Sequence, residues 1–200
     1  MARHPVLAFT DDDCYIVGDY FTAVQAAYVA HPIDYTGGRI LLSDPQDAFY
    51  ACNTDANFRL IPPRHFIAAG KIQGANMTLT LRAYEAVGPF DPALGAGTPF
   101  RCEDVDYVAR MSAAGLTGAH VPQIVVHHHH GRRDDDGLTK IKRDNDYARG
   151  AYYAKRLLLH DARVVLQWPR ITMRTKDHRF LTELRGAFDY IISRMAPRTS

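Results

Sequence analysis

The stretch Pro5-Val6-Leu7-Ala8-Phe9-Thr10-Asp11-Asp12-Asp13-Cys14 decides how this chain is interpreted. Its apolar half predicts a β-strand that carries three carboxylates at its C-terminal end, and open α/β sheets bind ligands at that edge. Adjacent like charges are costly unless a cation or hydrogen bonds offset them, so a hard divalent metal is a natural partner. The alternative is an acidic turn that simply faces solvent.

The composition is that of an ordinary soluble globular chain of one domain. The 200 residues are 46% hydrophobic and 23% charged, and the net charge of +2 argues against a dedicated nucleic-acid binder. Three scattered cysteines form neither a disulfide framework nor a CxxC site, which fits a reducing compartment. Residues 1–5 lack an apolar h-region and no apolar run approaches the length of a membrane span, so we expect neither a signal peptide nor a transmembrane helix.

The hydrophobic pattern predicts an α/β fold followed by a helical tail. A helix beginning after Asp19 would place Tyr20, Val24, Ala27 and Tyr28 on one face and stop before His31-Pro32. Residues 36–38 read as a turn, 44–70 as a long loop or a short irregular helix, and 131–136 as a charged loop. We further expect strands over 39–42, 71–78 and 119–126, and helices over 81–87, 104–114, 146–160 and 178–195.

Three polar clusters lie at the ends of predicted elements: Asp11 with Asp13, Glu103 with Asp104, and the run His127-His128-His129-His130. Carboxylates and imidazoles together suit manganese or magnesium. A carboxylate pair that opens a helix also offers a candidate general base. Successive strand residues alternate sides, so at most two of the four histidines, His128 and His130, are expected to face such a site.

An ordered set of short motifs resembles family 2 glycosyltransferases of the GT-A fold, over about residues 5–155. The acidic run is similar to the DxD motif of that family. No single motif is specific, but their order along the chain is. The other motifs are Gly74-Ala75-Asn76-Met77, Arg82, Val87-Gly88-Pro89-Phe90-Asp91, Leu94-Gly95-Ala96-Gly97-Thr98, Glu103-Asp104-Val105-Asp106 with Arg110, Pro122 with His128 six residues on, and Tyr147-Ala148-Arg149-Gly150.

The resemblance implies a partial GT-A mixed sheet with flanking helices. Residues 1–145 would form the C-terminal portion of the catalytic domain, and 146–200 a helical tail. In the family, the half that holds the nucleotide base and ribose precedes the acidic turn. We therefore expect the chain by itself to lack activity, and we expect it to self-associate through an unpaired strand edge and exposed apolar surface.

The activity that the resemblance implies is inverting transfer of a sugar from a nucleotide-diphosphate sugar to a hydroxyl acceptor, in cell-surface glycan or polysaccharide synthesis. Asp13 and His128, with Asp11 through water, would hold Mn²⁺ or Mg²⁺ on the diphosphate. Asp104 would accept the acceptor's proton and Glu103 would orient the acceptor. The resemblance also assigns substrate-binding roles to Asp11, Asp12, Gly74, Asn76 and Arg110.

The C-terminal helix carries an apolar stripe bordered by arginines. The resemblance implies a glycan or lipid-linked acceptor and a cytoplasmic protein, with peripheral contact at the inner face of the cell membrane. The alternative is that the stripe covers the catalytic sheet. The stripe consists of Phe180, Leu181, Leu184, Phe188, Ile191 and Ile192, near Arg179, Arg185, Arg194 and Arg198.

Each candidate also has a structural alternative. Asp104 could cap its helix, Gly74 and Asn76 could serve strand and turn geometry, and the histidine run could be a solvated strand exit. For the whole chain, the alternative to an enzyme is a non-catalytic remnant that binds a divalent metal or a partner chain. Histidine-rich metal storage is a third and weaker hypothesis. We read Cys102 as a small buried residue and 132–136 as a solvated loop.

Overall fold

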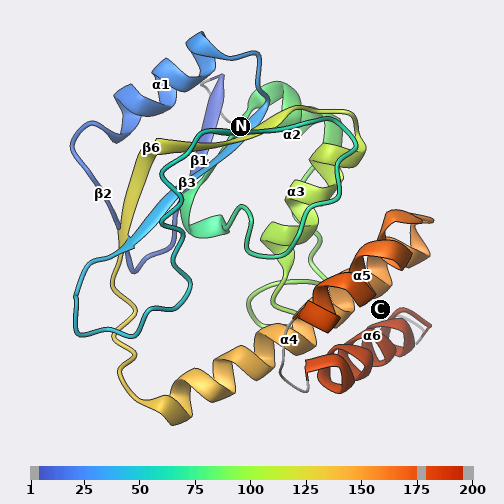
Figure 1. Ribbon diagram of the computed structural model, residues 1–200. Coiled ribbons are helices and arrows are strands. Elements are labelled where there is room, and N and C mark those ends of the chain that lie inside the picture. Colours follow the sequence, from blue (N-terminus) through green and yellow to red (C-terminus); the bar gives the residue numbers. More distant parts are fainter. Residues whose placement is uncertain (1–4, 175–178, 196–200) are drawn as a thin grey trace. The chain divides into compact units, whose positions relative to one another are not determined.

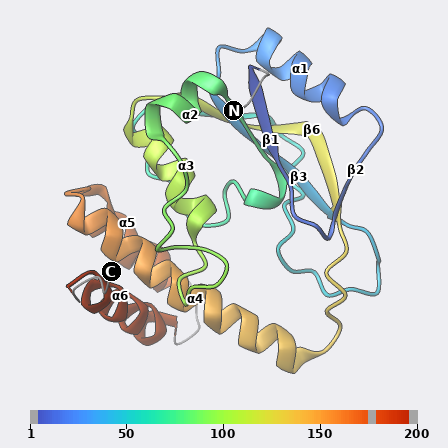
Figure 2. The ribbon, with the colours of Figure 1, turned by 180° about the vertical axis from the view of Figure 1, so that it is seen from behind.

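The computed structural model describes residues 5–174 and 179–195. Contacts divide the chain into two compact units, each described here by itself. The first unit comprises Met1–Pro89 and Tyr107–Asp135 and holds the β-sheet, whereas the second comprises Phe90–Asp106 and Asp136–Ser200 and is helical. Figure 1 shows the elements in sequence colours, and Figure 2 shows them from behind.

The first unit is built on a mixed sheet. In the described residues its strand order is β1-β5-β3-β6-β2, and β4 also pairs with β6. Only the β3–β6 pair is parallel, and the other pairs are antiparallel. The predicted α/β class, with a mixed sheet and flanking helices, is therefore confirmed. The strands are β1 (Val6–Phe9), β2 (Cys14–Ile16), β3 (Tyr35–Leu42), β4 (Arg59–Ile61), β5 (Met77–Thr80) and β6 (Gly118–His128).

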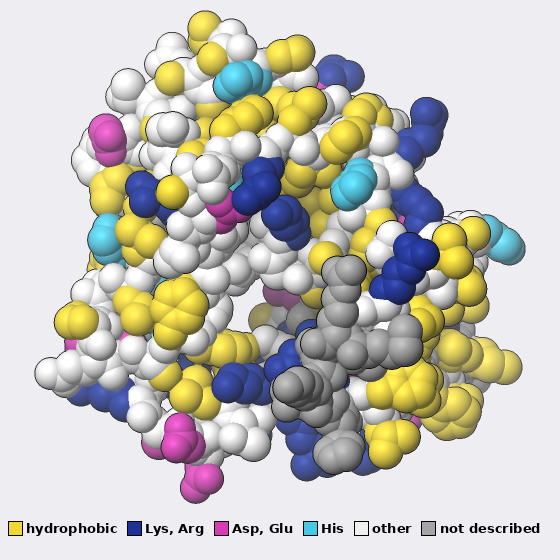
Figure 3. Space-filling view, viewed as in Figure 1, with side chains coloured by type: hydrophobic (Ala, Val, Ile, Leu, Met, Phe, Trp, Pro, Cys, Tyr) yellow, Lys and Arg dark blue, Asp and Glu magenta, His cyan; other side chains and the backbone are white. Residues whose placement is uncertain are grey.

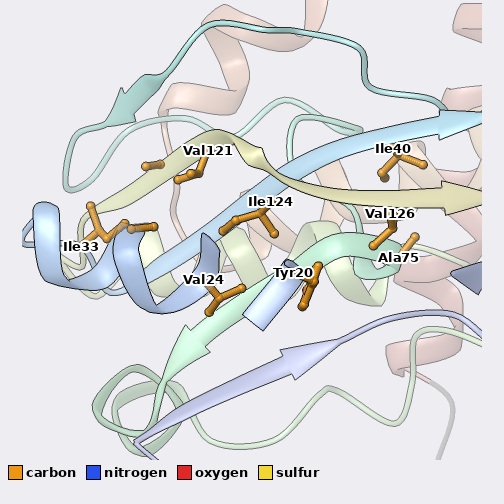
Figure 4. Close-up of a cluster of buried hydrophobic side chains, with 10 residues drawn as sticks. Tyr20, Val24, Ile33, Ile40, Ala75, Val121, Ile124 and Val126 are labelled. Carbon is orange, nitrogen blue, oxygen red and sulfur yellow. The ribbon is translucent and has the colours of Figure 1, made fainter. Parts of the chain in front are cut away.

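Helix α1 (Tyr20–Ala30) packs on the sheet through the face that the sequence predicts. Tyr20, Val24 and Ala27 are buried, and they join a cluster of β-strand side chains on β3 and β6. Figure 4 shows Tyr20 and Val24 directed toward Ile124 and Val126 of β6. The helix ends at Ala30, before His31, as predicted; Asp19 stands at the N-cap position but makes no side-chain capping hydrogen bond.

The predicted turn at 36–38 is wrong, because Gly37 and Gly38 lie inside β3. These glycines are needed for close approach within the sheet. A Cβ on Gly38 would lie 2.0 Å from the carbonyl oxygen of Ile124, and one on Gly37 would lie 2.9 Å from Cγ1 of Ile72. The β3–β6 register shifts at this point, between Gly37 and Arg39. Glycines that read as a turn signal therefore mark a bulge between two paired strands.

Two further strand predictions need correction. The strand expected over 71–78 is replaced by a 3₁₀ turn, η1 (Gly74–Asn76), and regular pairing begins only at Met77. Strand β6 continues two residues beyond the predicted end, so His127 and His128 belong to the sheet. Within the long loop of 44–70, the short strand β4 pairs with the start of β6.

The short helices match the predictions closely. Helix α2 (Leu81–Val87) begins where Thr80 Oγ1 accepts a hydrogen bond from Ala83 N–H, and it ends at Gly88 with φ of 71°. Helix α3 (Glu103–Ala113) buries one face and is followed by Gly115 with φ of 87°. The positive φ at both glycines explains why helices end there. The buried face of α3 includes Val105, Val108 and Ser112, as predicted.

The second unit has longer helices than the sequence predicts. Helix α4 (Asp135–Leu158) begins eleven residues before the predicted start, and α5 (Arg163–Arg174) was not predicted. Helix α6 (Arg179–Met195) matches the expected range to within one residue. Helices α4 and α6 cross closely, because a Cβ on Gly150 would lie 1.8 Å from Glu183 O and one on Gly186 would lie 1.9 Å from Tyr147 O. Over the described residues, no helix has the length and apolar content to cross a bilayer.

Candidate functional site

The acidic run forms a tight turn between β1 and β2. The Cys14 N–H donates to the Asp11 carbonyl at 3.1 Å, and the His129 N–H donates to the Asp13 carbonyl at 2.9 Å. The second bond ties the turn to the end of β6. Asp11 and Asp12 are exposed, whereas Asp13 is half-buried. The backbone thus directs Asp13, rather than its two neighbours, toward the histidine run.

Strand pairing fixes His128 beside this turn. His128 is the last residue of β6, where it pairs with Cys14 of β2 and with Leu42 of β3. Its Nε2 atom lies 3.2 Å from Oδ2 of Asp13, although the two residues are 115 positions apart in the chain. Only 6% of His128 is exposed, and its Nδ1 atom has no hydrogen-bond partner among the described residues. A buried imidazole and a half-exposed carboxylate therefore meet at the edge of the sheet.

The donor atoms fit a divalent cation. Asp13, Cys14 and His128 each offer one atom, and these atoms lie within 4.8 Å of one another. Adjacent ligands of an octahedral Mg²⁺ site are about 3 Å apart, since each is about 2.1 Å from the metal. The Asp13–His128 spacing matches that value. Asp11 does not belong to this group of three; Cys14 takes the third position instead.

Cys14 is a residue that the sequence reasoning missed at this site. Burial, followed by the negative charges of Asp13 and Asp11, raises the pKa of its thiol to about 12. The thiol donates to Asp13 Oδ1 at 3.7 Å. A protonated thiol is a poor ligand for a hard cation, so the carboxylate and imidazole are the stronger candidate ligands. Its position directly after the Asp triplet was the available signal.

The other histidines serve different contacts. His130 lies against His128, with ring centroids 5.1 Å apart, as strand alternation predicts. Its Nε2 atom is 3.0 Å from the Ala48 carbonyl and its Nδ1 accepts from Arg132 N–H at 3.0 Å. Both nitrogens of His130 are therefore engaged with the backbone. His127 is half-buried, and in the sheet it is the register partner of Tyr15 in β2 and of Leu41 in β3.

A second acidic group, Asp44 and Asp47 with His129, is organised by an arginine. Arg133 donates to Asp44 Oδ2 at 2.5 Å and to Asp47 Oδ1 at 3.3 Å, and the Gly131 N–H donates to Asp47 Oδ2 at 2.9 Å. Burial acts to raise the pKa of Asp47, but these donors and the adjacent histidines outweigh it and lower the pKa. The cluster is an ion-paired anchor between two loops, and Arg133 is part of it rather than of a purely solvated loop.

Two of the implied substrate-binding residues have structural partners. The Asn76 amide donates to the carbonyls of Arg39 at 2.8 Å and Ile124 at 3.0 Å, and its oxygen accepts from Tyr20. Arg110 donates to the carbonyls of Val87 and Pro89, at the C-terminal end of α2. Asn76 is buried, which favours the structural alternative for this residue.

The other implied substrate-binding residues are placed differently. Gly74 opens the 3₁₀ turn η1 and is half-buried. Asp11 and Asp12 remain exposed on the turn that follows β1. All three residues belong to the first unit.

The candidate base belongs to the second unit. Glu103 and Asp104 are half-buried in the first turn of α3, and Asp104 Oδ1 accepts from the Val105 N–H at 2.7 Å. Because α3 already begins at Glu103, Asp104 is inside the helix rather than at its cap. Gly95 has φ of 94°, and a Cβ there would lie 2.9 Å from Cδ of Glu103, so the glycine loop closes tightly over this carboxylate.

A buried ion cluster in the second unit was also not predicted. Lys155 Nζ lies 2.8 Å from Oδ2 of Asp91 and 2.8 Å from Oδ2 of Asp106. Burial acts to raise the pKa of Asp91, but the Lys155 hydrogen bond and charge outweigh it and lower the pKa. The cluster joins the loop before α3 to α4 and so supports the helix start that carries Asp104.

In comparisons with known proteins, no protein-family model and no curated protein matched the chain.

Proposed function

We propose that this protein takes part in metal-assisted transfer of a sugar from a nucleotide-diphosphate sugar to a hydroxyl acceptor, as in the family 2 glycosyltransferases that its motifs resemble. The observation that carries the proposal is the meeting of Asp13 and His128 at 3.2 Å. Two motifs at opposite ends of the sheet-forming sequence converge there with the spacing of adjacent metal ligands.

In this proposal Asp13 and His128 hold Mn²⁺ or Mg²⁺, and exposed Asp11 contributes through water. The cation would neutralise the charge that grows on the diphosphate leaving group. Asp13 is half-exposed, which leaves room for the diphosphate oxygens beside the carboxylate. His128 is fixed by strand pairs on both sides, so little ordering is required of it when a ligand binds.

Asp104 would accept the proton of the acceptor hydroxyl, and Glu103 would orient the acceptor. Both lie in the first turn of α3, which places two adjacent carboxylates at the start of the helix. A carboxylate base suits a reaction in which the proton moves late, after the bond to the diphosphate has begun to break.

The test is metal-dependent binding of a diphosphate. Retention of labelled inorganic pyrophosphate by the chain is measured by equilibrium dialysis with and without Mn²⁺. We expect retention only with Mn²⁺, and we expect Asp13→Asn and His128→Gln to lower it by ~10-fold or more, since the first removes the anionic charge and the second removes the imidazole. Asp19→Asn is the control, because Asp19 is an exposed carboxylate of the first unit that belongs neither to the Asp13–His128 pair nor to the implied substrate-binding residues.

The alternative, a metal-binding protein without transferase activity, has one observation in its favour. The Asp13–His128 pair is complete within the first unit and requires no residue of the second. Mn²⁺ binding that depends on Asp13 but retains no pyrophosphate would support this alternative over sugar transfer. Mn²⁺ binding that is equal in the parent and Asp13→Asn would contradict both.

A further inference from the structure

Helix α6 exposes a continuous apolar stripe, defined as Phe180, Leu181, Leu184, Phe188, Ile192 and Met195. Their exposed fractions run from 40% for Leu184 to 75% for Met195. At 100° per residue, the six side chains fall within about 120° of the helix circumference. Large apolar side chains scattered singly on a surface are ordinary, but six that share one face are not.

The opposite face of α6 is the one that packs. Glu183, Gly186, Ala187 and Tyr190 are buried. Glu183 accepts from Arg149 Nε and from Trp168 Nε1, each at 2.7 Å, and Gly186 lies against the backbone of α4. These contacts fix the rotation of α6 about its axis. Within the second unit the stripe is therefore the face of α6 that does not pack, and of the predicted set only Ile191 is half-buried.

Large apolar side chains are also exposed on the other helices of the second unit. Val165 and Leu166 on α5, and Leu157, Leu158 and Leu159 at the end of α4, are also exposed. Figure 3 shows hydrophobic side chains gathered where α5 and α6 lie, beside Lys and Arg side chains. An exposed apolar surface of this extent marks an interaction site.

The charge around the stripe indicates the partner. Among the described side chains of α5 and α6, three arginines are exposed (Arg170, Arg185 and Arg194), and the half-buried Asp189 lies 3.7 Å from Nε of Arg185. The second acid, Glu183, is buried and paired. By helix geometry Arg185 and Arg194 stand on opposite sides of the stripe. An apolar face bordered by cations matches an anionic lipid surface, whereas a second copy of the stripe would bring like charges together.

We propose that α6 docks on anionic lipid bilayers, with the stripe in the boundary between headgroups and acyl chains. A helix of 17 residues is about 25 Å long and can lie flat in that boundary. The stripe supplies the apolar contact, and Arg185 and Arg194 contact anionic headgroups. This surface lies on α6 and does not depend on the proposed sugar transfer.

The test is flotation of the full chain with vesicles of phosphatidylcholine, alone or mixed with phosphatidylglycerol, at low and high salt. We expect binding to the mixed vesicles at low salt and weaker binding at high salt. Leu181→Ser and Phe188→Ser should each reduce partitioning by ~10-fold, because each removes a large apolar side chain from the contact. Arg185→Gln should reduce binding to the mixed vesicles by roughly 5-fold.

Phe49→Ser is the matched control, since Phe49 is 70% exposed but lies in the first unit. It should bind vesicles like the parent. Leu181 and Phe188 are 72% and 63% exposed, so their variants should keep the parent's melting temperature. The proposal is overturned if the parent does not float with anionic vesicles at low salt, or if Leu181→Ser floats equally well. Self-association that Leu181→Ser abolishes, without vesicle binding, would assign the stripe to a second copy instead.

Discussion

Replacing Asp13 by Asn should lower the pKa of the Cys14 thiol and speed its alkylation. In the parent, burial and the charges of Asp13 and Asp11 raise that pKa from 9.0 to about 12. At pH 8 a thiol with a pKa near 9 is roughly 10% thiolate, and one near 12 is roughly 0.01%, so Cys14 should react ~10³-fold more slowly than an ordinary thiol. Removing the Asp13 charge removes the second cause of the shift, while burial, the first, remains.

The assay is alkylation by iodoacetamide across a pH series, with the Cys14 peptide quantified by mass spectrometry. In the parent, the rate should keep rising tenfold per pH unit beyond pH 10, since the thiolate fraction rises in that proportion below the pKa. In Asp13→Asn the profile should shift to lower pH but stay above that of a free thiol. Asp12→Asn is the control. A parent profile that levels off near pH 9, or an equal shift in Asp12→Asn, would refute the geometry of the acidic turn.

Two further predictions concern the second unit. In an active form of the protein, Asp104→Asn should lower transfer by roughly 10² to 10⁴ and leave donor binding nearly unchanged, because shape is kept while the proton acceptor is lost; near-normal turnover would exclude Asp104 as the base. Gly150→Ala should lower the free energy of unfolding by ~2 kcal/mol. The new Cβ would clash with Glu183 O at a cost of ~3 kcal/mol, whereas the better helix propensity of Ala returns only ~1 kcal/mol. Thermal unfolding measures the change, and an unchanged melting temperature would contradict the close crossing of α4 and α6. Gly18→Ala is the control, because a Cβ at Gly18 would have no atom within 4 Å.

The parts of the fold that were predictable are those with local causes. Strand β1, helices α1, α2 and α3, and the glycines that end α2 and α3 all follow from short patterns of apolar residues and breakers. The face of α1 that packs was read from the spacing of Tyr20, Val24 and Ala27 alone. In each case the neighbouring sequence contains the whole signal.

The parts that were missed depend on distant partners. Gly37 and Gly38 have the composition of a turn, and only the approach of Ile124 and Ile72 shows why they lie in a strand. The first turns of α4 carry only two large apolar residues, Leu138 and Ile141, which are too few to mark a helical period, and Pro169 breaks the expected pattern of α5. Lys155 and its two aspartates meet from three separate segments, which no spacing rule connects.

The candidate site divides in the same way. Convergence of Asp13 and His128 was expected from two strand ends, and the structure brings them together because Cys14 and His128 are register partners in β2 and β6. The sequence predicted Asp11 as a member of the group, but the structure places Cys14 there instead. The hydrogen bonds of the turn, rather than the residue type, decide which side chain faces inward. The sequence specifies which donors are available, and the turn selects among them.

The two halves of the proposed chemistry can be tested separately, because each is fixed within its own unit. The metal pair depends on strand register in the first unit, and the carboxylates depend on the start of α3 and its support by Lys155 in the second. Asp13→Asn should therefore lower Mn²⁺-dependent pyrophosphate retention by ~10-fold or more without changing the thermal stability of the second unit. Asp104→Asn should leave that retention intact. The proposed transfer uses both, so metal and diphosphate binding together with normal transfer by Asp104→Asn would mean that another residue is the base.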